Sequence, residues 1–222
     1  MGKVYKTEIN PYLHDGQSLL FSHGYNIHYN IIQPPKYVNV ILSAPSGAGL
    51  EVRKQYEIGK GIPGLIAVHQ DYTGSSFNLV LSYSKAIGLT RLGVFKSTFK
   101  EETETDLFGE QIILTGGIPK LIQSSYNVLL EAEYSPITAW FVCYYELKTI
   151  VDLFHSKGFE FMNQAISDTA EYGGITRGNR IIDKHVRDEM RNALKEIQSG
   201  EFHKEWMQET KDGFPTLTTL RK

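Results

Sequence analysis

An acidic run, KEETETDLFGE from Lys100 to Glu110, contains the residues with the clearest chemical potential in this chain. Within it, Asp106 and Glu110 lie four positions apart, so a helix would place both carboxylates on one face. The apolar residues around them predict that this helix is packed. Because Mg²⁺ prefers oxygen ligands, the pair suits a hard-cation site. A surface pair without a metal is the alternative, and these two residues alone leave both explanations open.

The other glutamates of the run, Glu101, Glu102 and Glu104, fall in the first turn of the predicted helix. Thr98 and Glu101 have the spacing of a capping box, which places the helix start at Thr98. Negative side chains near a helix N-terminus interact favourably with the helix dipole. We therefore predict that these three glutamates form a solvated face.

Further polar residues stand in apolar stretches or at strand ends. Glu146 interrupts an apolar stretch, and because an unpaired buried carboxylate is costly we expect it to be paired, metal-bound or on an exposed edge. His23 follows a predicted strand, where histidines are often structural, although ligands also bind at strand ends. The run from Ser167 to Gly174 is typical of a helix end with its cap. Cys143 has no basic neighbour in sequence and is predicted to be a core residue.

Two glycine-rich segments resemble phosphate-binding loops. Residues 59–64 match G-x-G-x-x-G, but they precede a strand and include Pro63, so we predict a turn. The run from Ser46 to Gly49 follows a strand, at the edge where open α/β sheets bind ligands. Most such loops are only turns.

The elements that must position these residues change character near residue 97. Before it, apolar runs bounded by glycine and proline predict strands of a buried parallel sheet at residues 18–22, 37–44, 64–69 and 92–95. A helix at residues 75–87 indicates an α/β layer. After it, helical spacing predicts helices at residues 98–116, 119–133, 136–156, 159–169 and 183–199. We predict two domains, residues 1–97 and residues 98–222.

Composition limits the class of protein. The 222 residues include 23 basic and 25 acidic side chains, and the net charge of −2 argues against a nucleic-acid partner. A hydrophobic content of 41% supports a folded core. The single cysteine excludes an internal disulfide framework. No apolar run approaches a membrane helix and no signal core is present, so we expect a soluble cytoplasmic protein without a membrane partner.

Four segments occur in an order that resembles one enzyme family. They read HGYNIH from His23, TFKEETETDLFGEQ from Thr98, ELKTIVDL from Glu146 and ISDTAEYG from Ile166. Together they closely resemble ketol-acid reductoisomerase of the short-chain class. The resemblance implies an α/β Rossmann-like domain followed by a knotted, all-α domain through which two subunits interlock. It also implies an oxidoreductase of branched-chain amino-acid biosynthesis, which rearranges 2-acetolactate with Mg²⁺ and reduces the product with NADPH.

The resemblance implies roles for individual residues. Asp106 corresponds to the carboxylate that bridges two metal ions, and Glu110 to a catalytic residue and ligand of the first ion. Glu146 corresponds to a ligand of the second ion, given across a dimer. Ser167 corresponds to the serine that contacts the substrate carboxylate, and His23 to the catalytic histidine near the nicotinamide. No residue is assigned to the cofactor.

The chain departs from the family pattern in three respects. Ser46 stands where the family has a lysine near the substrate, and Val142 where it has a metal-binding glutamate. The first part of the Rossmann domain, with its pyrophosphate loop, is expected to be missing. Losing one preorganised charge costs about 10²–10³ in rate. We therefore expect a truncated, degenerate paralogue, a pseudoenzyme with little activity alone and a single Mg²⁺ site.

Two other functions stay open. One is an active component that completes its NADPH site with another chain, such as a full-length relative. The other is a protein that binds one divalent ion or a small acid without reducing it. In each case the helical domain predicts a homodimer, or a heteromer with that relative.

Overall fold

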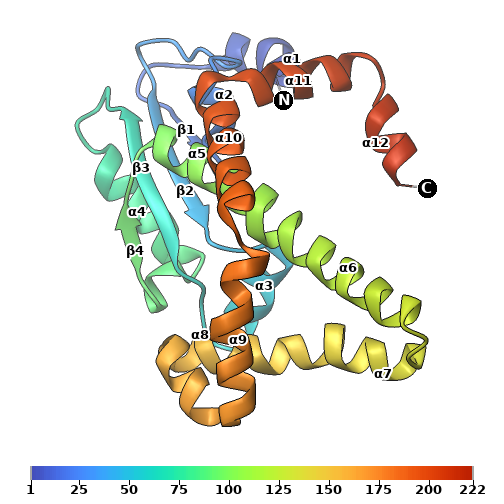
Figure 1. Cartoon of the computed structure of the whole chain (residues 1–222). Helices are drawn as coiled ribbons and strands as arrows, with labels where there is room; N and C mark the ends of the chain where they lie inside the picture. The colour runs from blue at the N-terminus through green and yellow to red at the C-terminus, as the bar shows by residue number, and fades with distance from the viewer. Residues whose placement is uncertain (1, 222) are drawn as a thin grey trace. The chain divides into compact units, whose positions relative to one another are not determined.

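The computed structural model describes residues 2–221, which form two compact units. The first contains the residues up to Leu107 and those from Gly200 onward, and the second is Phe108–Ser199. The last strand ends at Lys96, and every described element after it is helical (Figure 1). None of the described helices combines the length and the apolar character needed to cross a lipid bilayer.

The first unit is built on one sheet with the strand order β1-β2-β3-β4 (Figure 1). The strands are β1 (Ser18–Phe21), β2 (Asn39–Pro45), β3 (Gly64–Gln70) and β4 (Val94–Lys96). The helices that begin in this unit are α1 (Gly2–Val4), η1 (Tyr5–Ile9), η2 (Asn10–Tyr12), α2 (Tyr25–His28), α3 (Gly49–Glu57), α4 (Ser76–Ala86), η3 (Leu89–Arg91), α5 (Phe99–Gly109), α11 (Glu201–Lys211) and α12 (Pro215–Leu220). The predicted mixture of strands and helices is confirmed.

The sheet is mixed, so the predicted all-parallel arrangement is wrong. β1 pairs with β2 and β3 pairs with β4 in parallel, but β2 and β3 are antiparallel, with Pro45 opposite Gly64. The connection through α3 brings the chain back to the end of the sheet where β2 stops. β3 therefore starts beside the last residue of β2 and runs in the opposite direction. An apolar run predicts a buried strand but does not encode its direction.

β2 is buried over almost its whole length, as its continuous apolar run predicts. On one face it packs in a cluster that includes Ile27 and Phe99. On the other face, Ile41 packs with Val80 of α4. The core therefore holds the segment after β1 next to the start of α5.

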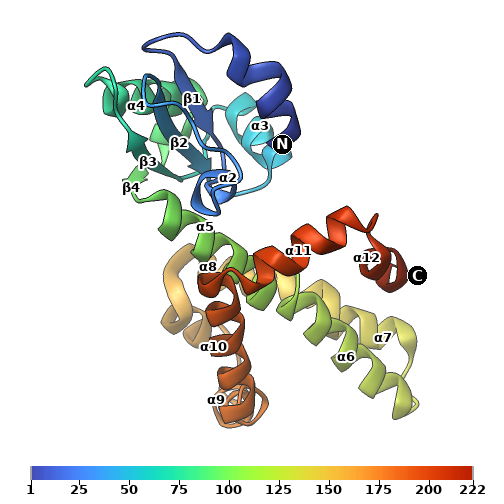
Figure 2. The same cartoon turned by 90° about the horizontal axis from the view of Figure 1, so that it is seen from above.

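The second unit is entirely helical. Its elements are the π-helical η4 (Glu110–Leu114), α6 (Gly117–Glu131), α7 (Pro136–Trp140), the π-helical η5 (Phe141–Tyr145), α8 (Glu146–Ala165), α9 (Asp168–Ile181) and α10 (Lys184–Ser199). α6 and α7 lie side by side near the turn that joins them (Figure 2). Gly158 interrupts α8 with a φ of 88°, which agrees with the predicted break.

Several local predictions differ from the structure. Ser167 opens a helix instead of closing one, because its Oγ accepts a hydrogen bond from the backbone N–H of Ala170 at 3.3 Å. The helix predicted for residues 159–169 ends at Ala165. Cys143 is half-buried and not a core residue. The helices α11 and α12 have no counterpart in the sequence prediction.

Candidate functional site

His23 stands between β1 and the one-turn helix α2, and α5 provides its partner. Nδ1 of His23 lies 2.9 and 3.0 Å from the two carboxylate oxygens of Glu102. Glu102 is only 4% exposed, so its carboxylate needs polar partners. The backbone N–H of Gly24 donates a second hydrogen bond to it, at 2.6 Å. One buried carboxylate thus joins the loop after β1 to the first turns of α5.

Gly24 allows this close approach. A Cβ at this position would lie 2.5 Å from the hydroxyl oxygen of Thr103 and 2.6 Å from the carbonyl oxygen of Phe99. Real Cβ atoms do not approach other atoms so closely, so any larger residue would push the loop away from α5. The glycine after His23 is therefore required by contact rather than by its backbone angles, since its φ is −78°.

Asp106 follows Glu102 by one turn of α5 and completes the group. Because Nδ1 of His23 faces Glu102, we assign the proton to Nδ1 and place Nε2 toward Asp106, 3.7 Å from Oδ2. Burial raises the pKa of Asp106, a protonated His23 ring would lower it, and the Glu102 carboxylate raises it further. A ring nitrogen beside a carboxyl group of raised pKa is suited to holding or passing a proton.

The prediction that Glu102 and Glu104 belong to a solvated face is wrong. Both are buried, at 4% and 7% exposure, whereas Glu101 is exposed. Glu104 contacts a second histidine, with its Oε1 3.3 Å from Nε2 of His28. Burial lowers the pKa of His28, and Glu104 opposes that shift. The two histidines of HGYNIH could have indicated this burial, because each can pair with a glutamate that is removed from water, here Glu102 and Glu104.

The remaining predicted residues lie in the second unit or in a loop. Glu110 opens the π-helical η4, and Glu146 directly follows the π-helical η5 on an exposed edge, one of its three expected situations. π-Helical turns are rare and are frequent at functional sites. Ser167 is exposed at the N-terminus of α9. Ser46 is exposed in the loop after β2, and Val142 is 49% exposed in η5.

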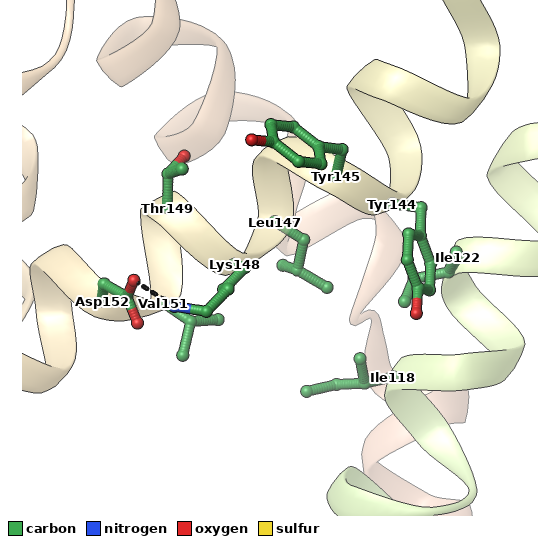
Figure 3. Close-up of a pocket in the computed structure, with 9 residues that line it drawn as sticks. All are labelled: Ile118, Ile122, Tyr144, Tyr145, Leu147, Lys148, Thr149, Val151 and Asp152. Atoms are coloured by element: carbon green, nitrogen blue, oxygen red, sulfur yellow. Dashed lines mark hydrogen bonds and ion pairs between the residues drawn. The ribbon is translucent and has the colours of Figure 1, made fainter. Parts of the chain in front are cut away.

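No group of three or more histidine, cysteine or acidic side chains able to hold a metal ion is found among residues 2–221. A pocket of about 640 Å³ lies within the second unit (Figure 3). Apolar side chains of α6 and α8 line it, together with two tyrosines of η5 and the Lys148–Asp152 ion pair. None of the candidate site residues lines it. The group with acid–base character is therefore His23, Glu102 and Asp106 in the first unit.

We expect Gly24→Ala to lower the free energy of unfolding by about 1–3 kcal/mol, because the added methyl overpacks the contact with α5. Gly173→Ala is the matched control, since nothing lies within 4 Å of a Cβ there. That change replaces a glycine inside α9 and should be neutral or stabilising by up to about 1 kcal/mol. Urea unfolding followed by circular dichroism measures the free energy of unfolding of both variants. Equal changes in the two variants would contradict a tight contact between Gly24 and α5.

We expect Asp106→Asn to stabilise the chain at neutral pH, by less than about 1 kcal/mol because the side chain is half exposed. The pKa of Asp106 is higher in the folded than in the unfolded chain, so ionisation weakens folding as pH rises through the folded value. The difference between variant and wild type should therefore grow as pH rises from about 3.8. Urea unfolding at several pH values tests this, and a difference that shrinks with rising pH would contradict it.

Comparison with known proteins places these residues in a family. Residues 1–93 match the family model "Acetohydroxy acid isomeroreductase, NADPH-binding domain", and residues 99–222 match "Ketol-acid reductoisomerase, C-terminal domain". The ketol-acid reductoisomerase (NADP(+)) of Methanocaldococcus jannaschii is 52% identical over 219 residues, which cover 99% of this chain and 66% of that protein. The chain thus spans about two thirds of the length of this relative.

Solved structures agree with this assignment. The NADH-preferring ketol-acid reductoisomerase from an uncultured archean superimposes with a TM-score of 0.97 and 43% identity, over 100% of this chain and 67% of that one. A putative oxidoreductase from Jannaschia sp. CCS1 shares the fold alone, with a TM-score of 0.64 and 11% identity, over 90% of this chain and 73% of that one. From both family models and from this identity, the chain belongs to the ketol-acid reductoisomerase family.

Proposed function

We propose that the chain serves the reaction of its family, the conversion of 2-acetolactate to 2,3-dihydroxy-isovalerate with NADPH. The observation that supports this most strongly is the assembled group of His23, Glu102 and Asp106 within a chain of this family. Glu102 orients the His23 ring, so that Nε2 is the atom that would hold or move a proton during the reaction. Branched-chain amino-acid biosynthesis in the cytoplasm would then be its place in the cell.

We further propose Asp106, Glu110 and Glu146 as ligands of Mg²⁺. Oxygen donors are the ligands that Mg²⁺ prefers, and a bound cation would favour the ionised form of Asp106, which burial disfavours. When bound, Mg²⁺ would polarise the ketone oxygen of the substrate. Glu110 would also act in catalysis.

Ser167 is proposed as the residue that receives the substrate carboxylate. It lies exposed at the N-terminus of α9, and backbone N–H groups at such an end favour an anion. This role follows from the family resemblance and is compatible with the exposure of the Ser167 hydroxyl.

We propose that the chain alone turns over slowly, because Ser46 and Val142 replace a lysine and a glutamate of the family pattern. Both positions are exposed, so packing in this chain does not require a small or an apolar residue there. Ser46 supplies no fixed positive charge where negative charge develops on the substrate. Val142 supplies no oxygen to a metal ion.

A homodimer is proposed for the second unit, with the knotted helical domain of the family at residues 98–222 and the Rossmann-like domain at residues 1–97. Among the described residues of this unit, Ala139 and Ile197 are the only buried apolar side chains. Exposed apolar residues extend over α6, α7 and η5. Large apolar faces of this kind mark interaction surfaces. A heteromer with another member of the family would cover the same faces.

The group of His23, Glu102 and Asp106 also favours a second candidate function. This function is the binding of one divalent ion or a small acid without reduction. The raised pKa of Asp106 would fall on binding a cation. This function needs neither a lysine at Ser46 nor an oxygen ligand at Val142.

The test of the reaction is oxidation of NADPH by the chain with 2-acetolactate and Mg²⁺. We expect a rate far below the median enzyme value of about 10 s⁻¹. Ser46→Lys combined with Val142→Glu should raise the rate by about 10²–10³ if the lost charge limits catalysis. Ser46→Met with Val142→Gln is the uncharged control and should stay slow. An ordinary family rate in the unmodified chain would contradict the proposed decay.

The oligomeric state is tested by sedimentation velocity. We expect a dimer, and a shift to monomer when lysine replaces both Leu121 and Val128, which lie two turns apart on one face of α6. Leu92→Lys in the first unit is the control, because Leu92 is as exposed as Val128, at 64% against 61%. A monomeric wild-type chain would contradict the proposed dimer. So would a Leu92→Lys control that dissociates as much as the variant with lysine at both Leu121 and Val128.

A further inference from the structure

His203 of α11 lies between two tyrosines that belong to α2 and its end. Its Nδ1 is 2.8 Å from the hydroxyl oxygen of Tyr25, a contact between residues 178 positions apart. Its ring stacks on that of Tyr29, with centroids 4.5 Å apart and planes 9° apart. The two tyrosines meet edge to face, with centroids 4.9 Å apart. The three rings form a compact cluster, which we call the latch.

The latch contacts α2, the helix that directly follows His23 of the candidate site. Tyr25 is two positions from His23, and their ring centroids are 6.1 Å apart. On α5, Glu102 holds the backbone N–H of Gly24 at one end of α2, and Glu104 contacts His28 at the other end. A helix of one turn has little stability of its own. The position of α2 therefore depends on α5 on one side and on His203 on the other.

The geometry points to His203 as a positioning residue: seated between Tyr25 and Tyr29, it fixes the one-turn helix that adjoins His23, and it releases this helix when it takes up a proton. The link to catalysis rests on the proposed function. The latch itself is a property of the first unit and requires no substrate.

The release follows from the cost of placing a charge in the latch. A neutral His203 accepts at Nδ1 from the Tyr25 hydroxyl, whose pKa burial raises to about 12, so that the hydroxyl keeps its proton. A protonated ring carries N–H groups at both nitrogens, so it can only donate to the Tyr25 hydroxyl oxygen, and it places a positive charge between two partly buried tyrosine rings. Burial lowers the pKa of His203, and His28 and Lys204 lower it further.

The sign of the pH dependence follows from this shift. The pKa of His203 is lower in the folded than in the unfolded chain, so the contribution of the latch is present above about pH 6.5 and is lost as pH falls through the folded value. The groups around it are Tyr25, His28 and Tyr29 on α2 and its end, Lys204 on α11, and Glu104 on α5, which faces Tyr29 and His28. His28 titrates in the same direction, so the experiment must separate the two histidines.

Hydrogen–deuterium exchange of the full chain, read as protection factors at about pH 8 and about pH 5, tests the proposal. In the wild type we expect protection of residues 23–29 and 201–211 to fall at the lower pH. His203→Phe keeps a ring but loses the acceptor, so its protection at high pH should fall about three- to tenfold and should no longer depend on pH. Tyr25→Phe should lose protection similarly at high pH.

His185→Phe is the matched control, because His185 is exposed on α10, and it should behave as the wild type. The backbone N–H of Gly24, which binds Glu102, reports directly on the candidate site. The proposal is overturned if His203→Phe exchanges like the wild type, if its pH dependence persists and disappears only in His28→Phe, or if β2 and α4 lose protection equally. The measurement involves no turnover, so a failed reductoisomerase assay leaves its result unchanged.

Discussion

The buried carboxylate of Glu102 is the interaction on which the site depends. It accepts hydrogen bonds from the His23 ring and from the Gly24 backbone, and it is almost completely removed from water. Removing either partner would leave a buried charge without compensation, which is costly. The same bonds orient the His23 ring and hold the loop after β1 on α5. The same few atoms therefore hold this loop in place and set the geometry of the site.

Local patterns predicted most elements because they record which residues must be buried. The apolar run of β2 and the break at Gly158 are read from neighbouring residues alone. The antiparallel pairing of β2 with β3 depends on where α3 returns the chain, which no local pattern states. The burial of Glu102 and Glu104 depends likewise on histidines roughly 80 positions earlier in the chain. In the site, the sequence singled out His23 and Asp106, but it assigned Glu102, which contacts the other side of the His23 ring, to a solvated face.

The second unit illustrates a related limit of sequence patterns. Helical periodicity correctly indicates that one stripe of a helix avoids water, as for α10, whose apolar stripe ends at the buried Ile197. It does not indicate what covers that stripe. Trp140 and Phe141 are 43% and 44% exposed although their stretch is apolar. Side chains that stay this exposed gain little hydrophobic stabilisation. Association with a second chain, as proposed above, would bury them.

Charge and burial in the first unit support the proposed binding of a ligand, whatever the rate of turnover. A carboxylate that is buried to bind a half-buried histidine is often no more stabilising than well-packed apolar residues of similar volume. Next to it, Asp106 has a raised pKa, so its ionised form is disfavoured in the fold. The buried carboxylate of Glu102 and the raised pKa of Asp106 do not favour stability, and they lie next to the same histidine. Such a combination is typical of a site that binds a ligand. The contacts that join His23 to Glu102 and Asp106 involve neither Ser46 nor Val142. The proposed binding of a ligand therefore depends on fewer residues than the proposed turnover does.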